Sequence, residues 1–192
     1  MTVSLPIAPE ANALLNRSPL ALLMGMLLDQ QVPLERAFSA PADLARRLGH
    51  DPEAGELADY DPDALVAVFG ERPALHRFPK AMAARVQALC RVLVDTYDGD
   101  AERVWADAKT GSELLKRVGS LPGFGEQKAK IFVALLGKQR DVRPEGWREA
   151  AGHYGEESVH RSVADIVDEV SLGKVRSYKQ QLKAAAKARS KT

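Results

Sequence analysis

The sequence predicts an all-helical fold. A helix-start signal, Ser or Asp followed directly by Pro, recurs along the chain. Between these signals, apolar residues repeat at helical spacing. Alternation of apolar and polar residues, which is typical of strands, is nearly absent. The connections are short, so the sequence favours a compact helical array over a coiled coil or a repeat solenoid.

The start signals locate the helices of the first third. Ser18-Pro19 places an N-cap residue before a proline and predicts a helix that extends to about Gln31. Val32-Pro33 ends it, because proline disfavours helical backbone in the residue before it. Asp51-Pro52 and Asp61-Pro62 repeat the signal and each predict a short helix.

The longest periodic stretch is 77–97, with Gly99 just beyond its end. Its apolar face is formed by Met82, Val86, Leu89 and Leu93. Cys90 lies in the same stretch and is expected to be a buried structural thiol. Shorter helices are expected at 102–107, 112–118, 126–138, 145–154 and 172–188.

Residues 20–28 are apolar on nearly every side, which is typical of a helix at the centre of a fold. The polar triplet Asp29-Gln30-Gln31 follows directly. Two interpretations of its amides stay open: they cap the carbonyl groups of their own helix, or they are presented to a ligand.

Charge and cysteine content restrict the function classes. Seven basic residues and no acidic one lie between Lys174 and the end, which leaves 20 basic against 26 acidic residues elsewhere. A basic end on an acidic body indicates a polyanion partner, although a solvated helical tail has the same composition. One cysteine excludes an internal disulfide, a Cys-rich zinc site and a four-cysteine iron–sulfur cluster. No secretory signal or membrane span is visible, so a cytoplasmic location is expected, at the nucleoid if the source is prokaryotic.

The segment Leu121-Pro122-Gly123-Phe124-Gly125 connects two short predicted helices. Glycines at these positions allow tight backbone conformations, and the N–H groups at the start of the next helix suit a phosphate. A helix corner without a ligand also uses glycine, so the residues alone leave both interpretations open.

This segment, followed by a helix with an early lysine, resembles the hairpin of the helix-hairpin-helix (HhH-GPD) base-excision-repair DNA glycosylases, such as endonuclease III and its adenine-specific relatives. Residues 22–31 resemble the central helix of that family, and Phe78-Pro79-Lys80-Ala81 leads a long helix that closes at 97–100, as in the family. The likeness covers about residues 14–140.

The resemblance implies a two-lobed HhH-GPD fold. Residues 28–138 are expected to form a six-helix-barrel-like lobe that carries the helix-hairpin-helix. Residues 1–27 with 139–192 are expected to form a second helical lobe with a basic C-terminal helix. Double-stranded, damaged DNA would lie in the cleft between them, bound by a monomer.

The resemblance also assigns site residues. Gln31 falls where the family fills the gap left by an extruded base, and Gly123 and Gly125 would hold a phosphate. The full expected DNA-binding set is Gln30, Gln31, Gly123, Gly125, Gln127, Lys128 and Lys130. Carbonyl groups of three hairpin residues match those that bind a monovalent cation, Na⁺ or K⁺, in the family: Gly119, Leu121 and Phe124. No iron–sulfur cluster is expected.

The catalytic positions of the family match less well. Gln127 stands at the lysine position, and Lys128 is about 100° further around the helix, so it should point elsewhere and strand-cleaving lyase activity is not expected. Counting 18 residues onward reaches Glu145, or Pro144 with a gap. Asp141 and Glu145 are therefore the predicted catalytic carboxylates, with surface salt bridging as the alternative role for both.

Three functions stay open. The leading prediction is a monofunctional DNA glycosylase homologue that binds damaged DNA and extrudes a base. The alternatives are a non-catalytic protein that recognises bent or damaged DNA, and a helical protein-interaction domain. If neither predicted acid serves catalysis, Asp29 is the next candidate. Trp147 is expected in the core, and no histidine pair has metal-ligand spacing.

Overall fold

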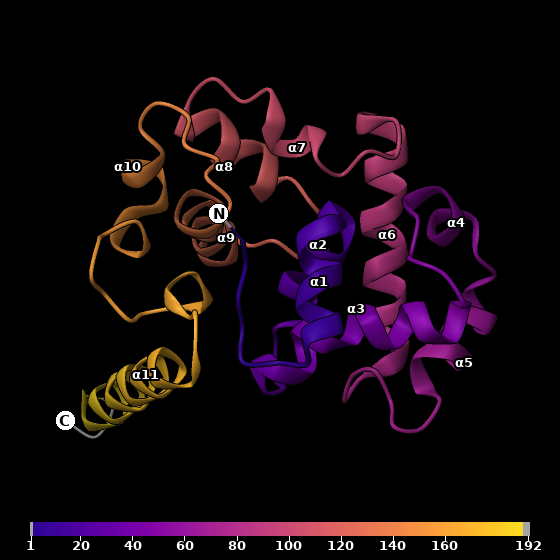
Figure 1. Ribbon diagram of the computed structural model, residues 1–192, viewed down its shortest axis with the longest axis horizontal. Coiled ribbons are helices and arrows are strands. Elements are labelled where there is room, and N and C mark those ends of the chain that lie inside the picture. The colour runs from indigo at the N-terminus through magenta and orange to yellow at the C-terminus, as the bar shows by residue number, and fades with distance from the viewer. Residues whose placement is uncertain (1, 190–192) are drawn as a thin grey trace.

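The computed structural model describes residues 2–189, and within this span the chain is all-helical, without a strand (Figure 1). The first half contains α1 (Pro9–Arg17), α2 (Pro19–Leu28), α3 (Leu34–Leu48), α4 (Ala54–Asp59), α5 (Pro62–Gly70) and α6 (Pro79–Tyr97). The second half contains α7 (Arg103–Ala106), α8 (Gly111–Gly119), α9 (Glu126–Gln139), α10 (Trp147–Ala151), the 3₁₀ turns η1 (Gly152–Tyr154) and η2 (Val163–Asp165), and α11 (Glu169–Arg189). The predicted all-α class is confirmed.

Helix α2 is the central helix that the sequence predicts. Every residue from Leu20 to Leu28 is buried, and the helix packs against α1, α3 and α6. The Ser18 hydroxyl accepts the Ala21 N–H at 3.1 Å, as expected of an N-cap residue. In Figure 1, α1 and α2 lie in the middle of the molecule, between α6 and α9.

The remaining helices pack around two long ones. Helices α4 and α5 pack on α6, whereas α8, α10 and η2 pack on α9. The hairpin helices α8 and α9 thus make their main contacts with the segments that follow them in the chain. The lobe boundaries at residues 28 and 138 stay a prediction.

Several helices differ from the predicted ones. Helix α2 ends at Leu28 rather than near Gln31, because Asp29 leaves the helical conformation with a ψ of 71° and Gln31 follows with a φ of +56°. Helix α4 begins at Ala54, so Asp51-Pro52 does not cap it. The sequence did not predict α3, which contains Pro41. Its apolar face packs against α1 and α2, and this burial outweighs the poor helix propensity of proline.

Helix α11 begins at Glu169, earlier than predicted, because the Asp168 carboxylate accepts the Ser171 N–H at 2.7 Å. Leu172 and Val175 anchor its first turns in the core. The rest of the helix is largely exposed and extends away from the other helices (yellow in Figure 1). None of the helices described is long and apolar enough to cross a membrane.

Two predicted core residues are confirmed. Cys90 is fully buried, and this burial raises the pKa of its thiol to about 12, so the thiolate is not populated at neutral pH. Trp147 is 7% exposed and packs on Gly137, where any Cβ would lie 2.3 Å from the indole ring. The Arg148 guanidinium covers the indole ring, 4.5 Å from its centroid.

Candidate functional site

The hairpin connects α8 to α9 through a tight turn at residues 120–125. The Phe124 N–H donates to the Leu121 carbonyl oxygen at 3.1 Å, and Gly123 has a φ of +84°. A side chain at Gly123 would be strained, and its Cβ would lie 3.2 Å from Cγ of Leu27. The turn requires glycine here, both for its backbone conformation and for its approach to the end of α2.

The first turn of α9 leaves its N–H groups open. Gly125 is the N-cap residue, and no side chain caps the helix. A Cβ added at Gly125 would have no atom within 4 Å. The first N–H groups of a helix have no intrahelical acceptor, and the helix dipole favours an anion near them. This end of α9 can therefore accept a phosphate without rearranging.

The turn that follows α2 is fixed by hydrogen bonds from three directions. The Gln30 side-chain amide donates to the Leu27 carbonyl oxygen at 2.7 Å and accepts from the guanidinium of Arg85 on α6. The Gln30 carbonyl oxygen is 3.0 Å from Nε2 of the buried His76. The sequence left two roles open for this amide, capping of its own helix and presentation to a ligand. The structure shows capping directly.

His76 is a neutral histidine with a defined tautomer. Its Nδ1 accepts the Phe78 N–H at 3.0 Å, so the ring proton is on Nε2 and is donated to Gln30. Burial lowers the pKa of His76, and nearby Arg36 and Lys128 act in the same direction. The charged form would disrupt the bond from Phe78.

The hairpin and the α2 turn, about one hundred residues apart in sequence, are joined directly. Lys128 on α9 donates from Nζ to the Leu27 carbonyl oxygen at 2.9 Å. Between them lies a cavity of about 620 Å³. Five parts of the chain line this cavity: the α2 turn, the start of α9, η1, the segment before η2, and α11. The lining residues include Asp29, Gln30, Gln31, Gly125, Gln127, Lys128, Tyr154, Arg161, Tyr178 and Lys179.

Most of the predicted DNA-binding residues meet at this cavity. Gln127 is oriented by a bond from its amide to the Tyr154 hydroxyl at 2.8 Å, and Gln31 is exposed at the tip of the α2 turn. Gln30, Gly125 and Lys128 also line the cavity. Gly123 lies against α2 beside the cavity, and the Lys130 ammonium is paired with Glu126 at 2.6 Å.

The expectation that Lys128 points elsewhere is not met, because its ammonium lies at the cavity wall. The Lys128 side chain reaches from α9 to the carbonyl end of α2, where the Leu27 oxygen also accepts the Gln30 amide. Burial lowers the pKa of Lys128 and the charge of Arg85 adds to this, whereas Asp29 opposes it.

Asp29 is the half-buried carboxylate of the cavity. Burial raises the pKa of Asp29, and Glu35 adds to the effect, while the ammonium groups of Lys179 and Lys128 oppose it. Within residues 2–189, no hydrogen bond or ion pair engages its side chain.

The two predicted catalytic acids lie outside the cavity lining. Asp141 is exposed, has a φ of +61°, and forms an ion pair with Arg143 at 3.2 Å. Glu145 is exposed, and its carbonyl oxygen accepts the Gly111 N–H at 2.7 Å in an isolated bridge to the start of α8. The structure therefore brings neither acid together with the glutamines and Lys128.

The three carbonyl groups expected to bind a cation fit that role in part. The Leu121 carbonyl oxygen accepts the Phe124 N–H, which leaves one lone pair. The carbonyl oxygens of Gly119 and Phe124 accept no hydrogen bond from the residues described. Leu121 and Phe124 belong to the hairpin turn and Gly119 ends the helix before it, and oxygen ligands of this kind suit Na⁺ or K⁺.

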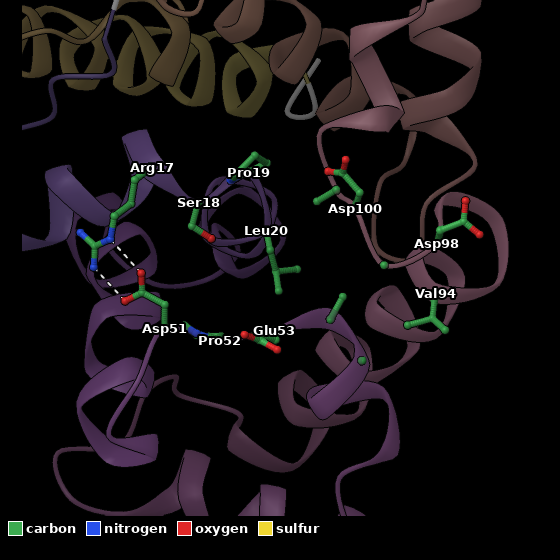
Figure 2. Close-up of a pocket in the computed structure, with 14 residues that line it drawn as sticks. Arg17, Ser18, Pro19, Leu20, Asp51, Pro52, Glu53, Val94, Asp98 and Asp100 are labelled. Atoms are coloured by element: carbon green, nitrogen blue, oxygen red, sulfur yellow. Dashed lines mark hydrogen bonds and ion pairs between the residues drawn. The ribbon is translucent and has the colours of Figure 1, made fainter.

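A larger hollow of about 830 Å³ lies elsewhere, between the α1–α2 junction, α4 and the end of α6 (Figure 2). Its charged lining is mostly acidic, with Asp51, Glu53, Asp98 and Asp100. The guanidinium of Arg17 is held by both carboxylate oxygens of Asp51 at 2.8 Å. Acidic groups repel a polyanion, so this hollow does not suit nucleic acid.

Several residues of the cavity were missed by the sequence analysis. Tyr154 and Tyr178 carry a weak signal, since each is an isolated aromatic residue in a polar segment. Arg85, Arg161 and His76 carry none, because only the tertiary structure brings them to the α2 turn and to the cavity.

Comparisons of this chain with protein-family models, with curated proteins and with solved structures found no match.

Proposed function

We propose that this protein is an HhH-GPD-type DNA glycosylase that binds damaged double-stranded DNA and cleaves the N-glycosidic bond of an extruded nucleotide. The observation that carries the proposal is the junction of the hairpin with the α2 turn at one cavity. The hairpin and the end of the central helix, both of which resemble the family, thereby meet at a cavity of about 620 Å³. A cavity of this volume has room for a nucleotide.

The phosphate backbone would bind at the start of α9. The open N–H groups there and the bare Gly125 allow close approach of an anion. Lys179 and the other basic residues of α11 add the positive charge that sequence-independent DNA binding requires. A monovalent cation on the carbonyl groups of Gly119, Leu121 and Phe124 would add positive charge on the hairpin side.

The α2 turn would act on the base pair. Gln31 is exposed at its tip, with its backbone fixed by the bonds of the neighbouring Gln30, so its side chain suits the gap that an extruded base leaves. The extruded nucleotide would enter the cavity beside Gln127 and Tyr154, whose polar groups can contact a base edge.

The test combines binding with base release. Duplexes that each carry one of a panel of damaged bases are incubated with the protein and treated with alkali, which cleaves the strand wherever a base has been lost. Base release from at least one lesion, together with weaker extrusion in Gln31→Ala by the fluorescence of 2-aminopurine, supports the proposal. No binding to any duplex contradicts it.

A second candidate is a non-catalytic protein that recognises bent or damaged DNA. The position of Asp141 and Glu145 outside the cavity favours it. It predicts tight binding to a duplex with an abasic-site analogue and no base release from any lesion.

A further inference from the structure

Two carboxylates line the cavity, and they differ in their surroundings. Glu126 is exposed and accepts a bond from the Lys130 ammonium at 2.6 Å, which lowers the pKa of Glu126. Asp29 is half-buried, and among the residues described its side-chain oxygens have no partner. Asp29 is therefore the carboxylate of this cavity that is free to act on a bound group.

The backbone that carries Asp29 is rigid. It directly follows α2, whose residues from Leu20 to Leu28 are all buried, and its N–H donates to the Gly25 carbonyl oxygen at 3.1 Å. The next residue, Gln30, is held by His76 and Arg85. A carboxylate on such a support is positioned before the substrate arrives, which is what electrostatic stabilisation of a transition state requires.

The charges of two lysines near Asp29 oppose the effect of burial, which raises the pKa of its carboxyl group. Lys128 and Lys179 lie close enough for their ammonium groups to favour the charged form, and Glu35 is the acidic neighbour that disfavours it. Arg161 also lines the cavity, but its guanidinium is engaged by Glu156 and by the His153 carbonyl oxygen. A partly desolvated anion interacts more strongly with a bound charge than an exposed anion does, because the local dielectric is lower.

We propose that Asp29 is the catalytic carboxylate of this cavity, and that it stabilises the positive charge which develops on the deoxyribose and accepts a proton from the attacking water. The proposal rests on the proposed function, in which a nucleotide enters this cavity. It transfers the catalytic role from Asp141 and Glu145, which lie outside the cavity, to the end of α2.

The reaction is a hydrolysis. The bond between C1′ of the sugar and the base nitrogen breaks, and its electron pair leaves with the base, so the sugar becomes oxocarbenium-like. A water oxygen forms a bond to C1′, and the proton that this water loses passes to the Asp29 carboxylate and then to solvent. The departing base takes one proton from solvent, so the products are an abasic site and the free base.

The test does not depend on which base is damaged. One duplex carries a pyrrolidine abasic nucleotide, whose ring nitrogen is positively charged, and a second carries the neutral tetrahydrofuran analogue of the same size. A site built for an oxocarbenium-like sugar binds the charged analogue more tightly. We expect the wild-type protein to prefer the pyrrolidine duplex by about tenfold or more, which corresponds to one new ion pair in a desolvated site.

Asp29→Asn should reduce this preference to about twofold or less while leaving affinity for the tetrahydrofuran duplex within about threefold of wild type. Asp141→Asn removes the same charge outside the cavity and should retain the full preference. Circular dichroism and the melting temperature of each variant verify folding.

The outcomes separate the two proposals. If the wild-type protein binds neither duplex, the proposed function fails, and the inference with it. If it binds both duplexes equally well, or if Asp29→Asn keeps the preference, only the assignment of Asp29 is wrong. Loss of the preference in Asp141→Asn instead would return the catalytic role to the segment after the hairpin.

Discussion

The Lys128 ammonium donates to the carbonyl oxygen of Leu27 at 2.9 Å and thereby fastens the first turn of α9 to the last turn of α2. The bond places a positive charge at the carbonyl end of a helix, where the helix dipole favours it. It also explains why the hairpin and the α2 turn share a cavity, since the two elements meet at this contact and at the approach of Gly123 to Leu27.

The two hairpin glycines should respond differently to substitution. Gly123→Ala forces a Cβ onto a φ of +84° and against Leu27, so it should lower the free energy of unfolding by about 1–2 kcal/mol. A Cβ at Gly125 meets no atom within 4 Å, so Gly125→Leu should leave stability within about 0.5 kcal/mol, but it should weaken DNA binding at least about tenfold by obstructing the phosphate. Urea denaturation and fluorescence anisotropy measure the two effects. Unchanged affinity in Gly125→Leu would contradict a phosphate at this position.

Charge neutralisation on α11 should flatten the salt dependence of DNA binding. Each basic side chain that contacts a phosphate contributes about 0.9 to the slope of log affinity against log salt concentration. Lys179→Gln and Lys183→Gln should each reduce the slope by about this amount. Arg46→Gln, at the far end of α3 where Arg46 pairs with Asp43, is the control and should leave the slope unchanged. Equal slopes in all variants would show that α11 does not contact the phosphates.

Lyase activity through a covalent lysine should be absent. Gln127 occupies the position of the attacking amine, and the amine of Lys128 is held by Leu27 rather than free to attack a sugar carbon. Borohydride trapping on DNA that carries a lesion or an abasic site should give no covalent adduct. A trapped adduct that disappears in Lys128→Ala would make this prediction wrong, and would show that the lowered pKa of Lys128 serves nucleophilic catalysis.

His76 should make the protein less stable at mildly acidic pH. Its pKa in the folded protein is below the ordinary value of 6.5, so the unfolded chain binds more protons than the folded one in this range. Stability should be fully present above about pH 6.5 and should fall as the pH drops through the lowered pKa of the folded state. His76→Gln should be less stable at neutral pH but should lack this decline. Melting temperatures from pH 5 to pH 8 measure it, and parallel curves for the two proteins would contradict the assigned tautomer.

Asp29 should carry a cost in stability. Its pKa is raised in the folded protein, so the folded state disfavours the ionised carboxylate and the penalty is fully present above the raised pKa. The penalty decreases as the pH falls through that value and is gone below the ordinary pKa of 3.8. Asp29→Asn should therefore raise the melting temperature at pH 7 by roughly 2 °C and should not raise it below about pH 3.8. A lower melting temperature at pH 7 would indicate that the attraction of Lys128 and Lys179 outweighs burial.

The sequence by itself determined the helical class, the central helix and the hairpin. Proline and cap residues act on their nearest neighbours, and apolar periodicity depends on a single helix, so all these signals are local. Ser18 and Asp61 accept N–H bonds as N-caps, whereas Asp51-Pro52 does not, because α4 begins only at Ala54. Helix α3 has an apolar face at helical spacing, but its Pro41 opposes a helix, and the packing of that face outweighs the proline.

The tertiary structure decided which polar groups meet at the cavity. Spacing along α9 predicted that Lys128 points away, but a lysine has a long flexible side chain, and the carbonyl group of Leu27, which also accepts the Gln30 amide, lies within its reach. Counting from the hairpin indicated Asp141 and Glu145, whereas the cavity contains Asp29, more than one hundred residues earlier. Distances between segments so far apart depend on the packing of α2 against its neighbours, which no local pattern in the sequence specifies.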